Sequence, residues 1–254
     1  MLSKNKKKFV TSLIHKKYRN QFNAFCAEGD KLNLDLISSE TSCIELIATE
    51  EWIKNNKNLL TENIIITITT ETELKSVSNL KSPPPVIGIY EITKHQLMIE
   101  QLSDSLIIVL DGVQDPGNMG TIIRIADWFG INNIICSEDS ADIYNPKVVQ
   151  ASMGAIARVK VQYVDLPSFI KRYKTKIRLP VYGTFLEGEN IYSQGLSKNG
   201  MIIMGSEGKG ISADIEKLIS NKLFIPSFTT EEPTSESLNV SVATAIICSE
   251  FRRR

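Results

Sequence analysis

The sequence is poor in the side chains on which metal and thiol chemistry depends. Histidine occurs only as His15 and His95, and neither lies near a plausible set of cysteine or carboxylate ligands. The four cysteines are far apart and show no paired spacing, so they predict neither a disulfide framework nor a zinc site. We therefore expect no metal, and we expect the cysteines to be small buried side chains in a reducing compartment.

Long apolar runs and an excess of one charge are also missing. No run reaches about 18 apolar residues, and no apolar segment of the kind found in signal peptides follows the basic N-terminus. We expect a cytoplasmic protein without a membrane segment. The 29 basic and 29 acidic side chains of the 254 residues cancel, so the net charge alone indicates no partner.

The charges are nevertheless unevenly distributed. Residues 1–20 contain seven lysines and arginines and no acidic residue, residues 171–178 contain five basic residues in eight, and three arginines end the chain. Basic patches on a neutral protein fit a polyanionic partner such as RNA. Solvated helix faces explain any single patch equally well.

Short β-branched runs alternate with amphipathic stretches, which predicts an α/β fold with parallel strands. We expect a basic helix up to about residue 18 and a last helix over 237–254. The run 106–110 is apolar throughout, as in a strand buried on both faces. The other expected strands are 22–27, 43–49, 64–69, 86–92, 133–137, 159–164, 179–185, 200–205 and 223–228. The polar segment near 94–104 predicts two domains, residues 1–98 and 99–254.

The first of three unusual loops follows the strand at 106–110. Ligands of parallel α/β sheets bind at the carboxyl ends of strands, and here Asn118 and Gly120 open a helix whose N–H groups face such an end. Helical spacing puts Arg124 on one face with Gly120 and Asp127, so Arg124 is not required to be buried. Two interpretations stay open, a functional guanidinium and a surface ion pair with Asp127.

The second and third loops follow later strands. Residues 204–212 hold Gly205, Gly208 and Gly210, which permit close approach of a ligand to the backbone. Their spacing is neither that of a Walker loop nor that of a dinucleotide fingerprint, which argues against a dehydrogenase and a Rossmann-type methyltransferase. In the third loop, 225–245, Ser235 or Ser237 can cap the last helix, and Asn239 is expected in its first turn.

Taken in this order, the three loops resemble the SpoU (TrmH-like) branch of the SPOUT RNA methyltransferases. The similarity covers about residues 106–250. It rests on N-x-G-x-x-x-R-x-A-x-x-x-G from Asn118, G-x-E-G-x-G from Gly205, and Ile225-Pro226 followed by Ser237-Leu238-Asn239-Val240-Ser241-Val242-Ala243. Residues 16–31 more loosely resemble the start of the family's substrate-binding domain, whose fold is like that of certain RNA-binding ribosomal proteins.

The resemblance implies a trefoil-knotted α/β domain that works as a homodimer. It implies methyl transfer from S-adenosylmethionine to a ribose 2′-hydroxyl of rRNA or tRNA, with rRNA favoured by analogy. The expected catalytic residues are Arg124, Asn118, Glu207 and Asn239. The expected cofactor-binding residues are Thr184, Gly205, Gly208, Ile225, Pro226, Ser237, Leu238 and Asn239. The expected RNA-binding residues are Lys16, Lys17, Arg19 and Lys31.

Some alternatives remain open at this point. Arg124 either clamps a phosphate or ribose, which we favour because a guanidinium is hardly ever neutral, or takes the proton. The acidic loop 229–236, with Glu231 and Glu232, departs from the family and could restrict access, and residues 152–161 lack an expected aromatic residue and proline. A non-catalytic RNA-binding protein with this fold is the main alternative function. A small-molecule α/β enzyme would leave the basic N-terminal part unexplained.

Overall fold

The computed structural model describes residues 1–39, 41–95, 98–228 and 237–253. It divides into two compact units, one of Met1–Lys94 with Asp142–Arg158 and one of His95–Ala141 with Val159–Arg254. The segment 142–158, which was expected in the C-terminal domain, thus belongs to the first unit. The boundary between residues 98 and 99 stays a prediction, and the acidic loop 229–236 with Glu231, Glu232 and Ser235 lies outside the described residues.

The first unit is built on a mixed sheet, not a purely parallel one. Its four strands among the described residues are, in spatial order, β1 (Ala24–Glu28), β4 (Val86–Glu91), β2 (Cys43–Thr49) and β3 (Ile65–Thr69). Strand β4 is antiparallel to both neighbours, whereas β2 and β3 are parallel. All four strands were predicted from the sequence, and their positions are confirmed.

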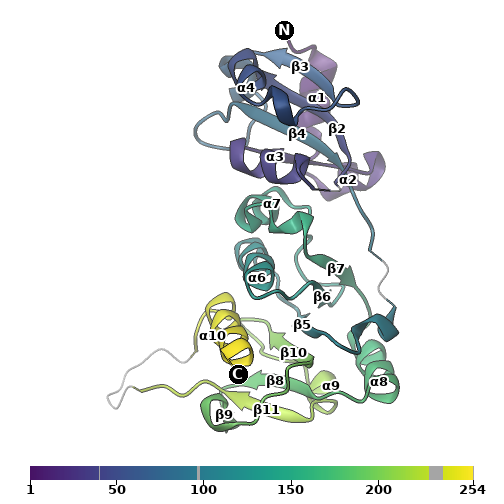
Figure 1. Ribbon diagram of the computed structural model, residues 1–254, viewed down its shortest axis with the longest axis vertical. Coiled ribbons are helices and arrows are strands. Elements are labelled where there is room, and N and C mark those ends of the chain that lie inside the picture. Colours follow the sequence, from purple (N-terminus) through teal and green to yellow (C-terminus); the bar gives the residue numbers. More distant parts are fainter. Residues whose placement is uncertain (40, 96–97, 229–236, 254) are drawn as a thin grey trace. The chain divides into compact units, whose positions relative to one another are not determined.

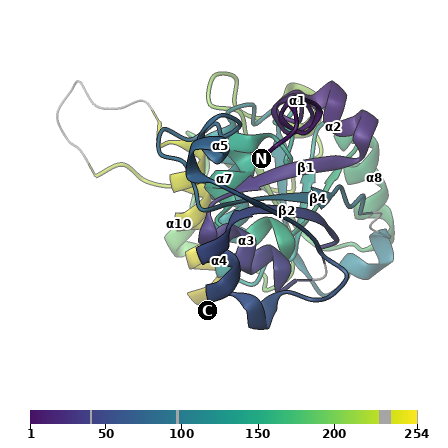
Figure 2. The same cartoon turned by 90° about the horizontal axis from the view of Figure 1, so that it is seen from above.

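Helices cover both faces of this sheet (Figure 2). On one face, an apolar cluster joins α1 (Lys4–Ser12) to α5 (Glu71–Lys75). On the other face, a second cluster joins Trp52 of α4 (Glu50–Asn55) to side chains of α3 (Asp30–Ile37). The remaining elements of the unit are α2 (Lys16–Phe22), η1 (Lys57–Leu59), α7 (Pro146–Ser152) and η3 (Ala155–Ala157).

The N-terminal basic segment forms two helices, whereas a single helix was predicted. The guanidinium of Arg19 is 2% exposed and donates to the backbone carbonyls of Leu13 at 2.9 Å and Ile14 at 2.7 Å. These groups follow the end of α1, where carbonyls lack helical partners. The guanidinium also pairs with Asp142 at 2.6 Å. Arg19 is therefore a structural residue, and the expectation that it contacts RNA is corrected.

We expect Arg19→Ala to lower the free energy of unfolding by about 3 kcal/mol, because it leaves two carbonyls and a carboxylate without their buried donor. Urea denaturation measures this change. The matched control is Lys17→Ala on the exposed side of α2, which should change stability by less than about 0.5 kcal/mol. Equal stability of the two variants would contradict the structural role of Arg19.

The second unit has the parallel sheet that was predicted. Among the described residues it contains seven strands in the order β7-β6-β5-β10-β8-β11-β9, and each pairing is parallel. The bounds are β5 (Leu106–Asp111), β6 (Asn133–Cys136), β7 (Lys160–Tyr163), β8 (Val181–Phe185), β9 (Glu189–Asn190), β10 (Gly200–Gly205) and β11 (Asn221–Phe224). Strand β9 was not predicted. Strand β11 ends before Pro226, which cannot donate to a sheet ladder, and not at residue 228.

Helices flank this sheet as well (Figure 1). An apolar cluster joins β5 and β10 to η2 (Ile99–Leu102), α8 (Leu166–Lys176) and α9 (Ala213–Glu216). Helices α6 (Pro116–Trp128) and α10 (Val240–Arg253) pack against each other, and η4 (Ile191–Ser193) follows β9. In the described part of the chain, no helix has the length and apolar composition needed to cross a membrane.

Candidate active site

The carboxyl ends of four parallel strands lie side by side in the second unit. Strands β5, β10, β8 and β11 are consecutive neighbours in the sheet, and Gly205 at the end of β10 pairs with Asp111 at the end of β5. The three loops predicted from the sequence leave the ends of β5, β10 and β11. They therefore emerge at one edge of the sheet, where parallel α/β folds bind their ligands.

The first loop leads into α6 through a capped helix start. The side chain of Asp115 accepts a hydrogen bond from the backbone N–H of Asn118 at 2.8 Å, and Pro116 occupies the first helical position. Both choices suit a helix N-terminus, because the carboxylate satisfies an open N–H and proline has none to lose. This start fixes Asn118 in the first turn of α6.

Asn118 is the centre of a chain of side-chain hydrogen bonds. Its Nδ2 donates to Oε1 of Glu207, and its Oδ1 accepts from Nδ2 of Asn239 at 3.0 Å. The hydroxyl of Ser241 lies 3.4 Å from the same Oδ1 and 2.6 Å from Oδ1 of Asn239. Asn118 thus joins one residue from each of the other two loops, and these are three of the four predicted catalytic residues.

Asn239 also caps the last helix, a role that the sequence predicts for Ser235 or Ser237. Its Oδ1 accepts the backbone N–H groups of Ser241 at 3.0 Å and Val242 at 3.4 Å, the pattern of an N-cap. Asn239 therefore precedes α10 and does not lie in its first turn, while Ser237 lies two residues earlier. The side chain of Asn239 therefore both caps α10 and donates a hydrogen bond to Asn118 in the loop after β5.

Arg124 does not join this chain. It lies on α6 six residues after Asn118, about 9 Å further along the helix axis, and its side chain is exposed. The buried residues of α6 are Met119, Gly120, Ile122, Ile123 and Ala126. Among the described residues, the side chain of Arg124 makes no hydrogen bond and no ion pair.

The loop after β10 closes tightly on itself. Ser206 and Gly210 exchange backbone hydrogen bonds of 3.1 and 2.9 Å, and Gly210 has a φ of +68°. A Cβ on Gly205 would lie 2.2 Å from the carbonyl carbon of Gly210 and 2.3 Å from the nitrogen of Ile211. Glycine is thus needed at 205 for the turn itself, a reason that the sequence pattern did not reveal. Around Gly208 there is open space.

The residues predicted to bind the cofactor lie at the same strand ends. Thr184 on β8 is half-buried and donates to the carbonyl of Ile203 at 3.2 Å. Ile225 and Pro226 after β11 are half-buried, and Leu238 is 49% exposed although it is apolar. Apolar side chains beside irregular backbone suit a ligand with an apolar ring and a few polar groups. The described residues therefore fit a nucleoside cofactor such as S-adenosylmethionine.

Exposed cations remain available on both units. Lys16, Lys17 and Lys31 are exposed, as an RNA contact requires. In the cluster 171–178, which begins on α8, Lys174 donates to the carbonyl of Leu218 and Lys176 pairs with Glu100. These two lysines therefore have partners within the protein. Among the described residues, no group of three histidine, cysteine or acidic side chains could hold a metal ion.

Comparisons with known proteins match two separate segments of the chain. Residues 105–249 match the SpoU rRNA Methylase family, and residues 4–88 match the MRM3-like substrate binding domain. A curated relative, the 23S rRNA (guanosine(2553)-2′-O)-methyltransferase RlmP of Bacillus subtilis, is 28% identical over 252 residues. The match covers 98% of this chain and 97% of that protein.

Solved structures show the same fold along the whole chain. A protein of the TrmH family from Porphyromonas gingivalis has a TM-score of 0.89 and 37% identity, with 100% of this chain and 99% of that one covered. An AdoMet-bound rRNA methyltransferase from Sinorhizobium meliloti has a TM-score of 0.86 at 24% identity, with 100% and 96% covered, a likeness of fold. The resemblance and the fold class predicted from the three loops are confirmed.

Proposed function

The chain belongs to the SpoU rRNA Methylase family and is an RNA methyltransferase, and from this premise we propose that it methylates a ribose 2′-hydroxyl of rRNA with S-adenosylmethionine as donor. The observation that carries the proposal is the hydrogen-bonded chain Glu207–Asn118–Asn239. It unites the three motif loops at the strand ends. The choice of rRNA is supported by the Bacillus subtilis relative, whose own substrate is 23S rRNA and which matches 98% of this chain.

S-adenosylmethionine supplies, when bound, a methyl group activated by its attachment to a sulfonium sulfur. We place its binding at Thr184, Gly205, Gly208, Ile225, Pro226, Ser237, Leu238 and Asn239. The chain's own residues must then hold the RNA so that the 2′-oxygen faces that methyl group. Positioning of this kind contributes about 7–11 kcal/mol to a reaction between two bound partners.

Arg124 is the group that we assign to the RNA. Its five N–H donors form a planar fork that matches a phosphate or two ribose oxygens, and its exposed position leaves that fork free for a ligand. A donor of this type favours the negative charge that develops on the 2′-oxygen, an effect of about 3–4 kcal/mol. A guanidinium holds its proton too firmly to act as a base, so Arg124 serves as a clamp. Asn118, Glu207 and Asn239 fix the three loops at the strand ends.

The proposal includes the wider arrangement that the family resemblance implies. We propose a homodimer in the cytoplasm, a trefoil knot in the second unit, and an N-terminal unit that holds the RNA through Lys16, Lys17 and Lys31. All three lysines are exposed, and the match to a substrate binding domain over residues 4–88 supports this division of roles.

The purified chain tests the proposed function in two measurements. We expect calorimetric titration to detect binding of S-adenosylmethionine, and we expect radiolabelled methyl groups to appear in 2′-O-methylnucleosides after digestion of treated rRNA. Binding of RNA without binding of S-adenosylmethionine would instead indicate a non-catalytic RNA-binding protein. Label found on a base would contradict the 2′-hydroxyl as acceptor.

Salt dependence tests the role of the lysines. We expect the affinity for RNA to fall steeply between 50 and 200 mM salt, and Lys31→Ala to reduce the slope of log K against log [salt] by about 0.7–0.9, the value of one phosphate contact. Lys57→Ala, another exposed lysine of the first unit, should leave the slope unchanged. Salt-independent binding of the unmodified chain would overturn this assignment.

A further inference from the structure

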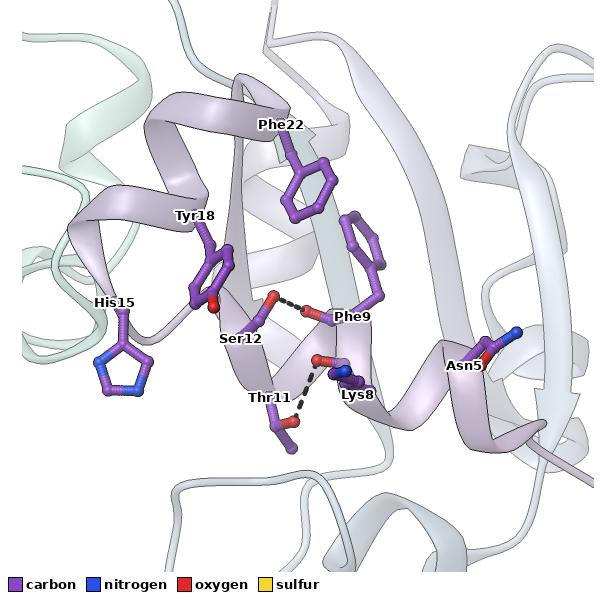
Figure 3. Close-up of a pocket in the computed structure, with 8 residues that line it drawn as sticks. All are labelled: Asn5, Lys8, Phe9, Thr11, Ser12, His15, Tyr18 and Phe22. Carbon is purple, nitrogen blue, oxygen red and sulfur yellow. Dashed lines mark hydrogen bonds between the residues drawn. The ribbon is translucent and has the colours of Figure 1, made fainter.

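A groove lies between the first two helices of the chain (Figure 3). It has a volume of about 640 Å³, and its lining includes Phe9 from α1 and His15, Tyr18 and Phe22 from the start of α2 onwards. None of these aromatic residues has a part in the methyl-transfer site. The groove therefore needs an explanation of its own.

The aromatic rings of the groove form a row. The ring centroids of Phe9 and Phe22 are 5.1 Å apart with the rings at 82°, and those of Tyr18 and Phe22 are 6.4 Å apart with nearly parallel planes. His15 continues the row at 6.4 Å from Tyr18. Phe22 is 43% exposed and Tyr18 is 37% exposed. The row thus presents a π surface to ligands, and such surfaces bind flat rings by stacking.

The groove is held in shape by buried interactions. Tyr18 and Phe22 are four residues apart and so lie on one face of α2. The break that turns α2 against α1 is fixed by the buried guanidinium of Arg19, which holds the carbonyls of Leu13 and Ile14. Among the lining residues, the hydroxyl of Ser12 donates to the carbonyl of Phe9 at 2.7 Å. A preformed site of this kind loses little entropy when a ligand binds.

Positive charge lies beside the aromatic row. Lys8 lines the groove, and Lys17 has its Nζ 6.0 Å from the centroid of the Tyr18 ring. In the described part of the first unit these two lysines form no ion pair. The segment 1–20 contains no acidic residue. Exposed rings with a cationic rim are the combination that binds single-stranded nucleic acid, where bases stack and phosphates contact lysines.

We propose that this groove binds an unpaired segment of the RNA substrate, with a base stacked on Tyr18 and Phe22 and adjoining phosphates on Lys8 and Lys17. The proposal rests on the proposed function, which makes RNA the substrate. The base must be unpaired, because the faces of a base inside an A-form helix are covered by its neighbours in the stack and cannot contact the rings. Charge complementarity selects RNA over an apolar protein segment, which would gain nothing from the cationic rim.

Fluorescence anisotropy with the full chain tests the proposal. The probes are a labelled single-stranded RNA of about ten nucleotides, within the range of such sites, and a duplex of the same sequence. We expect Tyr18→Ala and Phe22→Ala each to weaken binding of the single strand by roughly tenfold, the effect of one lost base stack, and to leave binding of the duplex unchanged. Tyr18→Phe keeps the ring and should retain the affinity. Leu59→Ala removes an apolar side chain of the same unit that is 44% exposed, and it should have no effect.

Three results would contradict the proposal that the groove binds single-stranded RNA. These are equal binding by the variants and the unmodified chain, equal loss of single-strand and duplex binding, or no single-strand binding at all. If Phe22→Ala unfolds through its contact with Phe9, the pair Tyr18→Ala and Tyr18→Phe still decides. Titration of the same proteins with S-adenosylmethionine reports on the methyltransferase site separately. If the chain binds single strands through the groove but does not bind S-adenosylmethionine, the proposed function is contradicted, whereas RNA binding by the groove is supported.

Discussion

Arg124→Ala is expected to slow methyl transfer to RNA by about 100- to 1000-fold, the usual cost of removing one donor to a developing negative charge. The affinity for S-adenosylmethionine should not change, because the residues assigned to the cofactor lie at or after the carboxyl ends of β8, β10 and β11, whereas Arg124 lies on α6. The fold should also persist, since the side chain is exposed and its neighbours Ile123 and Ala126 supply the buried surface of the helix. Single-turnover transfer of radiolabel and calorimetric titration measure the two effects.

Two further variants make this prediction specific. Arg124→Lys keeps the positive charge but loses the planar fork, so we expect it to restore little activity if the guanidinium holds two oxygens at once. Lys217→Ala removes an exposed cation that pairs with Asp214 on α9, and it should transfer methyl groups at the normal rate. A near-normal rate for Arg124→Ala would show that its role has been misassigned.

Gly205→Ala is expected to weaken the binding of S-adenosylmethionine by about tenfold or more. The added Cβ would meet the backbone of Gly210 and Ile211 at 2.2 and 2.3 Å, and backbone cannot move aside as a flexible side chain can. The turn closed by Ser206 and Gly210 must therefore open. Overpacking of this kind costs about 1–3 kcal/mol, and a loss of about 1.4 kcal/mol in binding energy raises the dissociation constant tenfold. Calorimetric titration measures the loss.

The matched control for this change is Gly195→Ala. Gly195 is an exposed glycine of the same unit with nothing within 4 Å of its missing Cβ, so both affinity and thermal stability should be retained. Unchanged affinity of Gly205→Ala would mean that the loop after β10 adapts without loss of the site. The placement of the cofactor beside this loop would then be wrong.

The parts of the fold that follow from short-range patterns were predictable. The run at 106–110 is apolar in each residue, and it forms the buried strand β5 near the middle of the parallel sheet. The three motif loops were assigned to strand ends, and parallel strands necessarily bring those ends to one edge. Strand β9 was missed because Glu189 and Asn190 are two exposed polar residues without a periodic pattern.

The parts that depend on distant contacts were not predictable. Nothing in residues 16–20 distinguishes Arg19 from its basic neighbours, yet its guanidinium is buried against Leu13, Ile14 and Asp142. The second use of Asn239, as a partner of Asn118, depends on a residue 121 positions away. The need for glycine at position 205 arises from the path of the backbone at Gly210. Each case is a tertiary interaction that local spacing cannot express.

Mapping of ribose methylation in total RNA from cells with and without the gene tests the central claim most directly. We expect one 2′-O-methyl group of rRNA to disappear with the gene, and to return with the unmodified chain but not with Arg124→Ala. An identical set of 2′-O-methyl groups in both cells would contradict the claim that this chain is a ribose methyltransferase. A loss confined to tRNA would contradict the choice of rRNA.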